Sequence, residues 1–309
     1  MQSFLPSPPT STHIRSTIDG RFRTASPAPA ANGTDESIDS KAIDSLLNEL
    51  AVVLARWNLY VKFLAVKCQV TVPGNRIDTK YGSPILEIPK FVTNAALSNK
   101  ILRIRSSFES LETFFFRRSV EKAFQLDEPS HQSGPPTTSV IDDVMFVLRK
   151  VLDRAMGTGD ADLLKTICAN TRRILDLDFA GVIKRRATMD RTILGTGKFD
   201  DIIRREKIRP FIAELNNLNI SSESVKALTE GYLSGNLDGL FPFGNQLDIA
   251  KSALLNVGSL KSRFDGYLHV VLVEMILMIR RAWQRSLHNS LNWGSRSWLT
   301  MFLQACNIP

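Results

Sequence analysis

One short run of this sequence has the residue types of a phosphate-binding loop. Residues 195–198 read GTGK, and the backbone N–H groups and the lysine of such a turn can hold a phosphate. The complete motif also needs a glycine at the place of Thr192, a serine or threonine at the place of Phe199, and a preceding strand. The sequence has none of these, so we interpret 195–198 as a loop between helices.

Two pairs of neighbouring aspartates have the residue types of a general acid and a general base. They are Asp142 with Asp143 and Asp200 with Asp201. Adjacent residues on a helix point about 100° apart, so neither pair converges on one substrate atom. Both pairs lie near expected helix starts, where the helix dipole favours negative charge. We therefore interpret both as helix-start residues.

The histidines and cysteines are too widely spaced for the common metal or redox motifs. No two histidines lie three or four residues apart, as a two-ligand helix face requires. The cysteines form neither a CxxC motif nor a disulfide framework, which favours a reducing compartment. The residues concerned are His13, His131, His269, His288, Cys68, Cys168 and Cys306. We predict no catalytic, cofactor-binding or metal-binding residue, no cofactor, and a protein that is not an enzyme.

The net charge of +8 comes from 39 basic and 31 acidic residues. A basic excess can attract nucleic acid or an anionic membrane. The densest basic groups lie at 184–186 and 204–207, and neither is interleaved with aromatic residues as in RNA-binding motifs. We interpret both as solvated helix faces. A basic helical protein that binds nucleic acid is the less favoured alternative.

Long apolar stripes predict the elements that carry these residues. Over residues 43–64 and 97–115, apolar side chains recur at alternating spacings of four and three, which is typical of one buried helix face. The first stripe is Ile43, Leu47, Leu50, Leu54, Trp57, Val61 and Leu64; the second is Leu97, Ile101, Ile104, Phe108, Leu111 and Phe115. We predict that the second helix covers 91–126, after a loop over 73–90 that is rich in proline and glycine.

Further helices follow along the chain. We expect one that Ser139 caps and that Gly157 and Gly159 end. The others are expected at 160–186, at 199–218 with a kink or break at Pro210, from a cap at Ser221 and Ser222 to residue 233, and, after a loop over 235–244, at 246–291. No segment shows sustained alternation of β-branched and polar residues. The sequence therefore predicts an all-α fold, an elongated stack of helical bundles.

Composition divides the chain into three parts. Residues 1–36 are rich in Ser, Thr, Pro and Ala, which predicts disorder. Residues 37–291 form the helical domain, and 292–309 an atypical tail. No secretory signal is recognisable at the N-terminus.

The most apolar stretch, 268–279, is twelve residues long, and a membrane-spanning helix needs about 20 apolar residues. We therefore expect at most peripheral membrane association. Because a helix apolar nearly all round needs extensive cover, we also expect an exposed apolar patch near Val270, Val273, Ile276 and Met278.

Three segments resemble a known family. They are LETFFFRRSVEKAFQLDE at 111–128, TSVIDDVMFVLRKVLDRAM at 138–156 with 167–179 following, and FIAELNNLNISSESVKAL at 211–228 with FPFGNQ at 241–246. In order and spacing they resemble the C-terminal half of subunit four of the conserved oligomeric Golgi complex, and 51–68 is similar to fungal members. The residues that fit the pattern are Glu112, Phe115, Arg117, Val120, Lys122, Ala123, Leu126 and Asp127, then Val140 or Ile141, Asp142, Asp143, Val144, Arg154 and Ala155.

The resemblance implies a function that composition alone does not reach. It implies a helical rod of a multisubunit vesicle tether that acts in retrograde transport within the Golgi. The implied location is the Golgi membrane, peripherally, on its cytosolic face. The implied partners are sister subunits, SNARE proteins and their regulators, and Rab-type GTPases. A general helical adaptor of another pathway is the first alternative.

Overall fold

The computed structural model describes residues 40–68, 88, 90–94, 96–129, 135–187 and 201–288, without the side chains of 201–207, 279 and 282–288. Clustering of contacts divides the chain into two units, Met1–Ser37 and Ile38–Pro309, and the described residues all belong to the second. The predicted disorder of 1–36, most of the predicted loop over 73–90, the loop at 195–198 and the tail at 292–309 lie outside the described residues.

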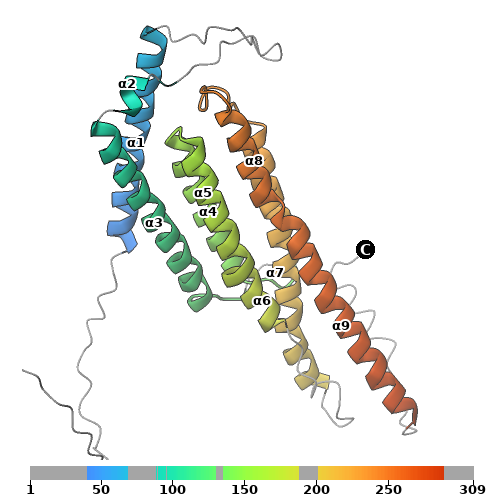
Figure 1. Ribbon diagram of the computed structural model, residues 1–309. Coiled ribbons are helices and arrows are strands. Elements are labelled where there is room, and N and C mark those ends of the chain that lie inside the picture. Colours follow the sequence, from blue (N-terminus) through green and yellow to red (C-terminus); the bar gives the residue numbers. More distant parts are fainter. Residues whose placement is uncertain are drawn as a thin grey trace, which may run out of the picture. The chain divides into compact units, whose positions relative to one another are not determined.

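Helices account for nearly all of the described chain, which confirms the all-α prediction (Figure 1). The only β-type pairing there is an isolated bridge between Pro129 and Thr138. The elements are α1 (Ser40–Lys67), α2 (Lys90–Thr93), α3 (Ala96–Gln125), α4 (Val140–Gly157), α5 (Ala161–Ile174), the π-helical turn η1 (Leu175–Ala180), α6 (Gly181–Arg186), α7 (Asp201–Leu233), α8 (Gln246–Gly258) and α9 (Leu260–His288).

The two long apolar stripes are the buried faces of α1 and α3. Leu47, Leu54 and Val61 are buried on α1, and Phe108 and Phe115 on α3. The second stripe was predicted one turn too long, because Leu97 is half exposed. The predicted helix from residue 91 is also interrupted: the short α2 ends before α3 begins at Ala96.

The start of α4 corrects one prediction. Ser139 precedes the helix, but its side chain makes no capping hydrogen bond, because its backbone is already helical (φ −67°, ψ −19°). The carboxylate of Asp127 instead accepts from the backbone N–H of Val140 at 3.2 Å. The predicted end of the helix is confirmed, since α4 ends at Gly157 and Gly159 has a left-handed backbone with φ 68°.

The helix expected at 160–186 is continuous but contains one wide turn. Asp160 caps α5, where its carboxylate accepts from the N–H of Leu163 at 3.0 Å. The chain then passes through η1 into α6. A π turn places one extra residue in the helix and so rotates the faces that follow it.

Residues 201–233 form one helix, α7, so the predicted break before Ser221 is wrong. Ser221 donates to the carbonyl of Asn217 four residues earlier, and Ser222 donates to Asp265 of α9. Their hydroxyls therefore have partners without any helix start. Pro210 lies inside the helix; the burial of the residues after it, such as Phe211 and Leu215, helps to hold the helix together.

The predicted single helix over 246–291 is two helices, α8 and α9, separated at Ser259. The last residue of α8, Gly258, lies against Thr229 of α7. A Cβ at Gly258 would lie only 2.9 Å from the Thr229 hydroxyl oxygen, so the helices can approach this closely only at a glycine.

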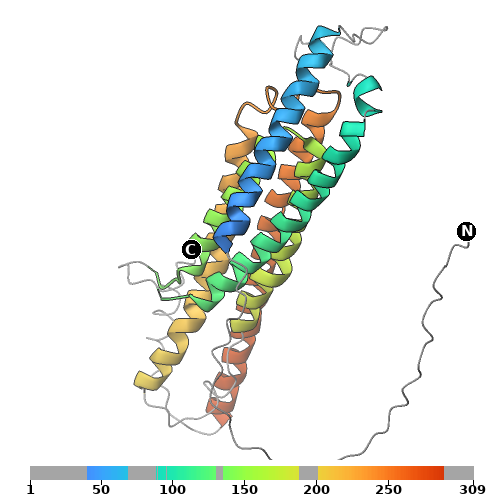
Figure 2. The ribbon, with the colours of Figure 1, turned by 90° about the vertical axis from the view of Figure 1, so that its left-hand side faces the viewer.

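The helices pack side by side in series. α1 contacts α3 and α4, α5 contacts α3, α4 and α8, and α7 contacts α4, α8 and α9; Figures 1 and 2 show α1 on one side of the bundle and α9 on the other. The largest completely buried side chains include Phe108, Phe116, Phe179 and Phe264. They join both sides into one main core.

The far part of α9 has the exposed apolar side chains that the sequence predicts. Val270, Val273 and Ile276 are exposed, whereas Met278 is half-buried and packs on a small cluster with Phe211 and Val271. None of the described helices is both long enough and apolar enough to cross a membrane.

Candidate functional site

Among the residues singled out for their chemistry, those that the structure describes are dispersed. Asp142 and Asp143 lie in the exposed first turn of α4, as predicted. The side chain of Asp201 is not among those described, and Asp200 and the run 195–198 lie outside the described residues. Of the residues named here, only Asp142 and Asp143 have described side chains, and these lie in the exposed first turn of α4.

The histidines and cysteines are equally dispersed where they can be placed. His269 is exposed on α9, and no group of three His, Cys, Asp or Glu residues suited to a metal ion occurs among the described residues. Cys68 is exposed and Cys168 is buried. Burial raises the pKa of the Cys168 thiol to about 12, which leaves it protonated and unreactive. His13, His131 and Cys306 lie outside the described residues.

Two clusters of polar groups among the described residues are each built around one arginine. In the α1–α4 cluster, Arg154 of α4 donates to Asp44 of α1 at 2.5 Å and to Glu112 of α3 at 2.6 Å. Lys150 also donates to Asp44, at 2.5 Å. The guanidinium of Arg154 lies 5.1 Å from the centre of the Phe115 ring. One side chain thus joins three helices.

Burial and pairing act in opposite directions on the two carboxylates of the α1–α4 cluster. Glu112 is almost fully buried, and desolvation raises its pKa to about 6 although Arg154 pulls it down. For Asp44, desolvation also acts upward, but hydrogen bonds from Lys150 and Arg154 leave the pKa below its ordinary value. Asp44 is therefore ionised throughout the near-neutral range, whereas Glu112 takes up a proton as the pH falls through about 6.

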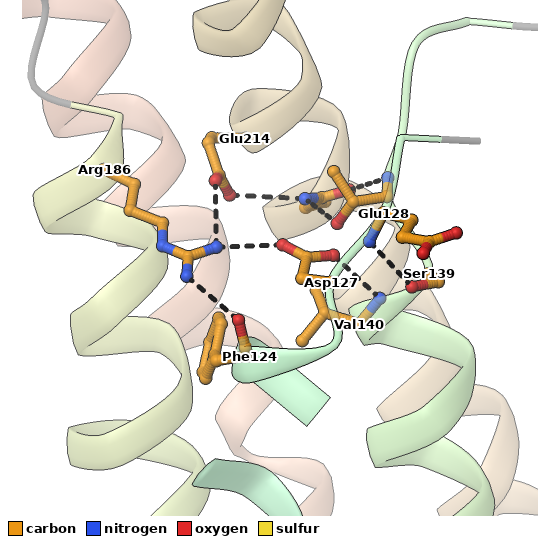
Figure 3. A network of polar contacts seen from close by, with 9 residues as sticks. Phe124, Asp127, Glu128, Ser139, Val140, Arg186 and Glu214 are labelled. Carbon is orange, nitrogen blue, oxygen red and sulfur yellow. Dashed lines mark hydrogen bonds and ion pairs between the residues drawn. The ribbon is translucent and has the colours of Figure 1, made fainter. Parts of the chain in front are cut away.

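The second cluster, the α6–α7 cluster, lies where α6 and α7 meet the chain between α3 and α4 (Figure 3). Arg186 donates to Asp127 at 2.9 Å, and its guanidinium lies 3.7 Å from Glu214 of α7. Asp127 bonds with its other oxygen to the N–H of Val140. Asp127 therefore connects an ion pair to a helix start.

A side-chain amide extends the α6–α7 cluster. Asn217 donates to Glu214 at 3.2 Å and accepts from the N–H of Thr138 at 3.1 Å. Ser139 accepts from the N–H of Glu128 at 3.2 Å. These bonds hold the connection between α3 and α4 against α7. The basic run 184–186 is exposed, as interpreted, but Arg186 in addition pairs with two carboxylates.

The two aspartates of η1 hold helices on opposite sides. Asp178 pairs with Arg117 of α3 at 3.1 Å. Asp176 accepts from Arg263 and from the Tyr267 hydroxyl, both of α9. Two residues apart on a helix, the two aspartates point about 200° apart and so reach different neighbours. The chemistry of all three regions is the joining of helices.

The sequence pointed to several of these residues, but it did not show which of them pair with one another. Glu112, Asp127 and Arg154 all lie in the segments that carry the family resemblance. A signal for the pairing was available: Glu112 lies on the same helix face as Phe108 and Phe115, and Arg154 on the same face as Val151. A charge on a buried stripe requires a partner inside the protein.

Comparison with known proteins gives one consistent family. The family model described as "COG4 transport protein, middle alpha-helical bundle" matches residues 12–187. Whereas the resemblance was first assigned to the C-terminal half, this model describes the middle bundle. No solved structure matches the chain.

Curated relatives carry the same name across distant organisms. The chain is similar to conserved oligomeric Golgi complex subunit 4 of Drosophila melanogaster, with 28% identity over 71% of this chain and 30% of the relative. The human protein of that name is 25% identical over 79% of this chain and 34% of the relative. That of Schizosaccharomyces pombe is 22% identical over 75% and 32%. The chain thus spans about a third of the length of these relatives.

Proposed function

The chain belongs to the COG4 family, and on this premise we propose that it is a non-enzymatic helical part of the conserved oligomeric Golgi complex, a vesicle tether. Its work there is retrograde vesicle transport within the Golgi and the maintenance of Golgi organisation. The match of the family model to residues 12–187 is the observation that carries the proposal.

The interior supports a structural role. The buried and half-buried charges of the two clusters are paired with groups on neighbouring elements, for example Arg154 with Asp44 and Glu112. A catalytic site needs groups that remain available to a substrate. Charges that join helices are suited to a rod that keeps its shape while its surface binds other proteins. In this proposal residues 37–291 act as one helical domain.

The proposed partners are the sister subunits of the complex, SNARE proteins with their regulators, and Rab-type GTPases. The proposed location is the Golgi membrane, held peripherally on the cytosolic face. Assembly with the sister subunits is the primary contact, because the names of the relatives state membership of that complex.

Affinity purification tests this proposal. The tagged chain is expressed in cells, alone and joined to the parts of a relative that lie outside the matched region, and sister subunits are measured by mass spectrometry. We expect their enrichment over a tag-only control, greater for the joined form. Recovery of an unrelated set of proteins by both forms would favour a general helical adaptor.

A salt titration addresses the nucleic-acid alternative. The exposed basic side chains would give affinity for DNA or RNA that falls steeply with salt if several phosphates were neutralised. We expect no such binding at physiological salt, because Arg186, the basic residue of the α6–α7 cluster, is already paired. Tight, salt-sensitive binding of a random oligonucleotide would contradict the tether proposal.

A further inference from the structure

Helix α1 has a second apolar face that points away from the bundle. Of the described helices, α3 and α4 make its main contacts, and Figure 2 shows α1 at the front of the bundle. Seven large apolar side chains on the other face are each at least 43% exposed: Leu46, Val52, Val53, Leu59, Tyr60, Phe63 and Val66. We call these residues, with the charges among them, the α1 outer face.

The α1 outer face is built of rows with a period of seven residues. Val52, Leu59 and Val66 form one row, and Leu46, Val53 and Tyr60 form another. At 100° per residue these rows lie about 100° apart on the helix. A period of seven keeps each row nearly parallel to the helix axis, which suits the packing of another helix along it. An apolar patch that meets a membrane needs no such register.

The row between them carries the charges. It consists of Ala42, Glu49, Arg56 and Phe63, all exposed. Neither Glu49 nor Arg56 has an ion-pair partner among the described residues. A charge in the centre of an apolar seam selects a partner with the opposite charge at the same height.

This central row is complementary to itself when reversed. If a second copy of α1 lies antiparallel, with the twofold axis between Val52 and Val53, Glu49 of each copy meets Arg56 of the other. The same symmetry places the small Ala42 opposite the large Phe63. The outer rows then pair apolar with apolar near the axis, Val52 with Val52 and Val53 with Val53. A single twofold rotation therefore matches both the charges and the side-chain sizes of the two copies.

We propose that two copies of this chain associate through the α1 outer face as an antiparallel helix pair. The seam from Ala42 to Phe63 is about 32 Å long at 1.5 Å per residue. It contains two Glu49–Arg56 contacts, one on each side of the axis. The proposal goes beyond the tether function and does not depend on it.

Sedimentation of the full chain tests the pair. The wild type is expected to be dimeric at micromolar concentration. Glu49→Arg and Arg56→Glu each replace both attractive contacts with repulsive ones, and each should weaken the dimer roughly tenfold or more. An equimolar mixture of the two variants should form a heterodimer, because each then supplies the charge that the other lacks. Circular dichroism verifies that both variants are folded.

Three results would overturn the proposal. The first is a wild type that stays monomeric, whether it remains free or binds vesicles of phosphatidylserine and phosphatidylcholine. The second is a dimer that both charge reversals leave unchanged. The third is a dimer that is lost with the control Glu274→Arg, which reverses an exposed charge beside the apolar side chains of α9; association would then use that helix.

Discussion

Arg154 and Arg186 have similar neighbouring groups, but their side chains differ in how far they are buried. Each guanidinium lies between two carboxylates from other parts of the chain and against a phenylalanine ring, Phe115 for Arg154 and Phe124 for Arg186. The side chain of Arg154 is 7% exposed and that of Arg186 is 38% exposed. The Arg154 guanidinium is therefore much more deeply buried, and its ion pairs are shorter, 2.5 and 2.6 Å against 2.9 and 3.7 Å.

The difference teaches which interactions the fold depends on. Water reaches the Arg186 guanidinium, and its two carboxylates, although largely buried, each keep another hydrogen-bond donor. No water reaches the Arg154–Glu112 pair freely, so each charge requires the other. We expect the same substitution to have very different costs at the two sites.

Arg154→Leu should have the largest effect. It leaves Glu112 buried without its main counter-ion, which typically costs about 3–5 kcal/mol of the free energy of unfolding. Chemical denaturation of the purified variant measures this. Arg154→Lys, which keeps the charge but loses the two-armed contact, should cost less. Equal stability of Arg154→Leu and the wild type would mean that Glu112 is neutral or solvated.

The raised pKa of Glu112 gives a pH dependence of the opposite sign to that of an ordinary paired carboxylate. Between pH 4.5 and about 6 the folded state holds more protons at Glu112 than the unfolded state. Stability should therefore fall as pH rises through this window, by on the order of 2 kcal/mol. Glu112→Gln should remove this slope. A slope that persists in Glu112→Gln denaturation curves would assign it to another group.

Arg186→Leu should be milder. It removes the ion pairs with Asp127 and Glu214, whose side chains are only 8% and 11% exposed. Glu214 still accepts from Asn217, so we expect a loss of about 1–2 kcal/mol. Asp127 keeps its bond to the N–H of Val140. Thermal unfolding measures the loss. A cost as large as that of Arg154→Leu would show that exposure does not distinguish the clusters.

Arg117→Leu should have the smallest effect. Arg117 and Asp178 are 50% and 40% exposed, and exposed pairs contribute at most about 1 kcal/mol. The same unfolding assay should place this variant within that range of the wild type. It serves as the control for removing an arginine that bridges two elements.

The all-α class and most helix positions could be predicted because the buried face of each long helix is visible as an apolar stripe within its own sequence. The predicted faces of α1 and α3 required no knowledge of their neighbours. Predictions that concerned a single hydrogen bond were less successful. Ser139 and Ser221 have the residue type of a helix cap, but the partner that each hydroxyl takes depends on segments elsewhere in the chain.

The clusters were only partly predictable for the same reason. Glu112 and Arg154 are 42 residues apart, and nothing local to either states that they meet. Arg186 belongs to a basic run that resembles any solvated surface, and its carboxylates come from α7 and the α3–α4 connection. Pairing is a property of the assembled bundle, whereas a stripe is a property of one helix.

The close approach of Gly258 to Thr229 has a consequence for evolution. A methyl group at 258 would lie 2.9 Å from the Thr229 hydroxyl oxygen, and that hydroxyl is held by the carbonyls of Val225 and Lys226. A chain that gained alanine at 258 would therefore need a smaller residue at 229 to keep α7 and α8 together. Among homologous sequences, a larger residue at 258 should therefore occur together with a smaller residue at 229. The summed side-chain volume of the two positions should vary less than the volume at either position.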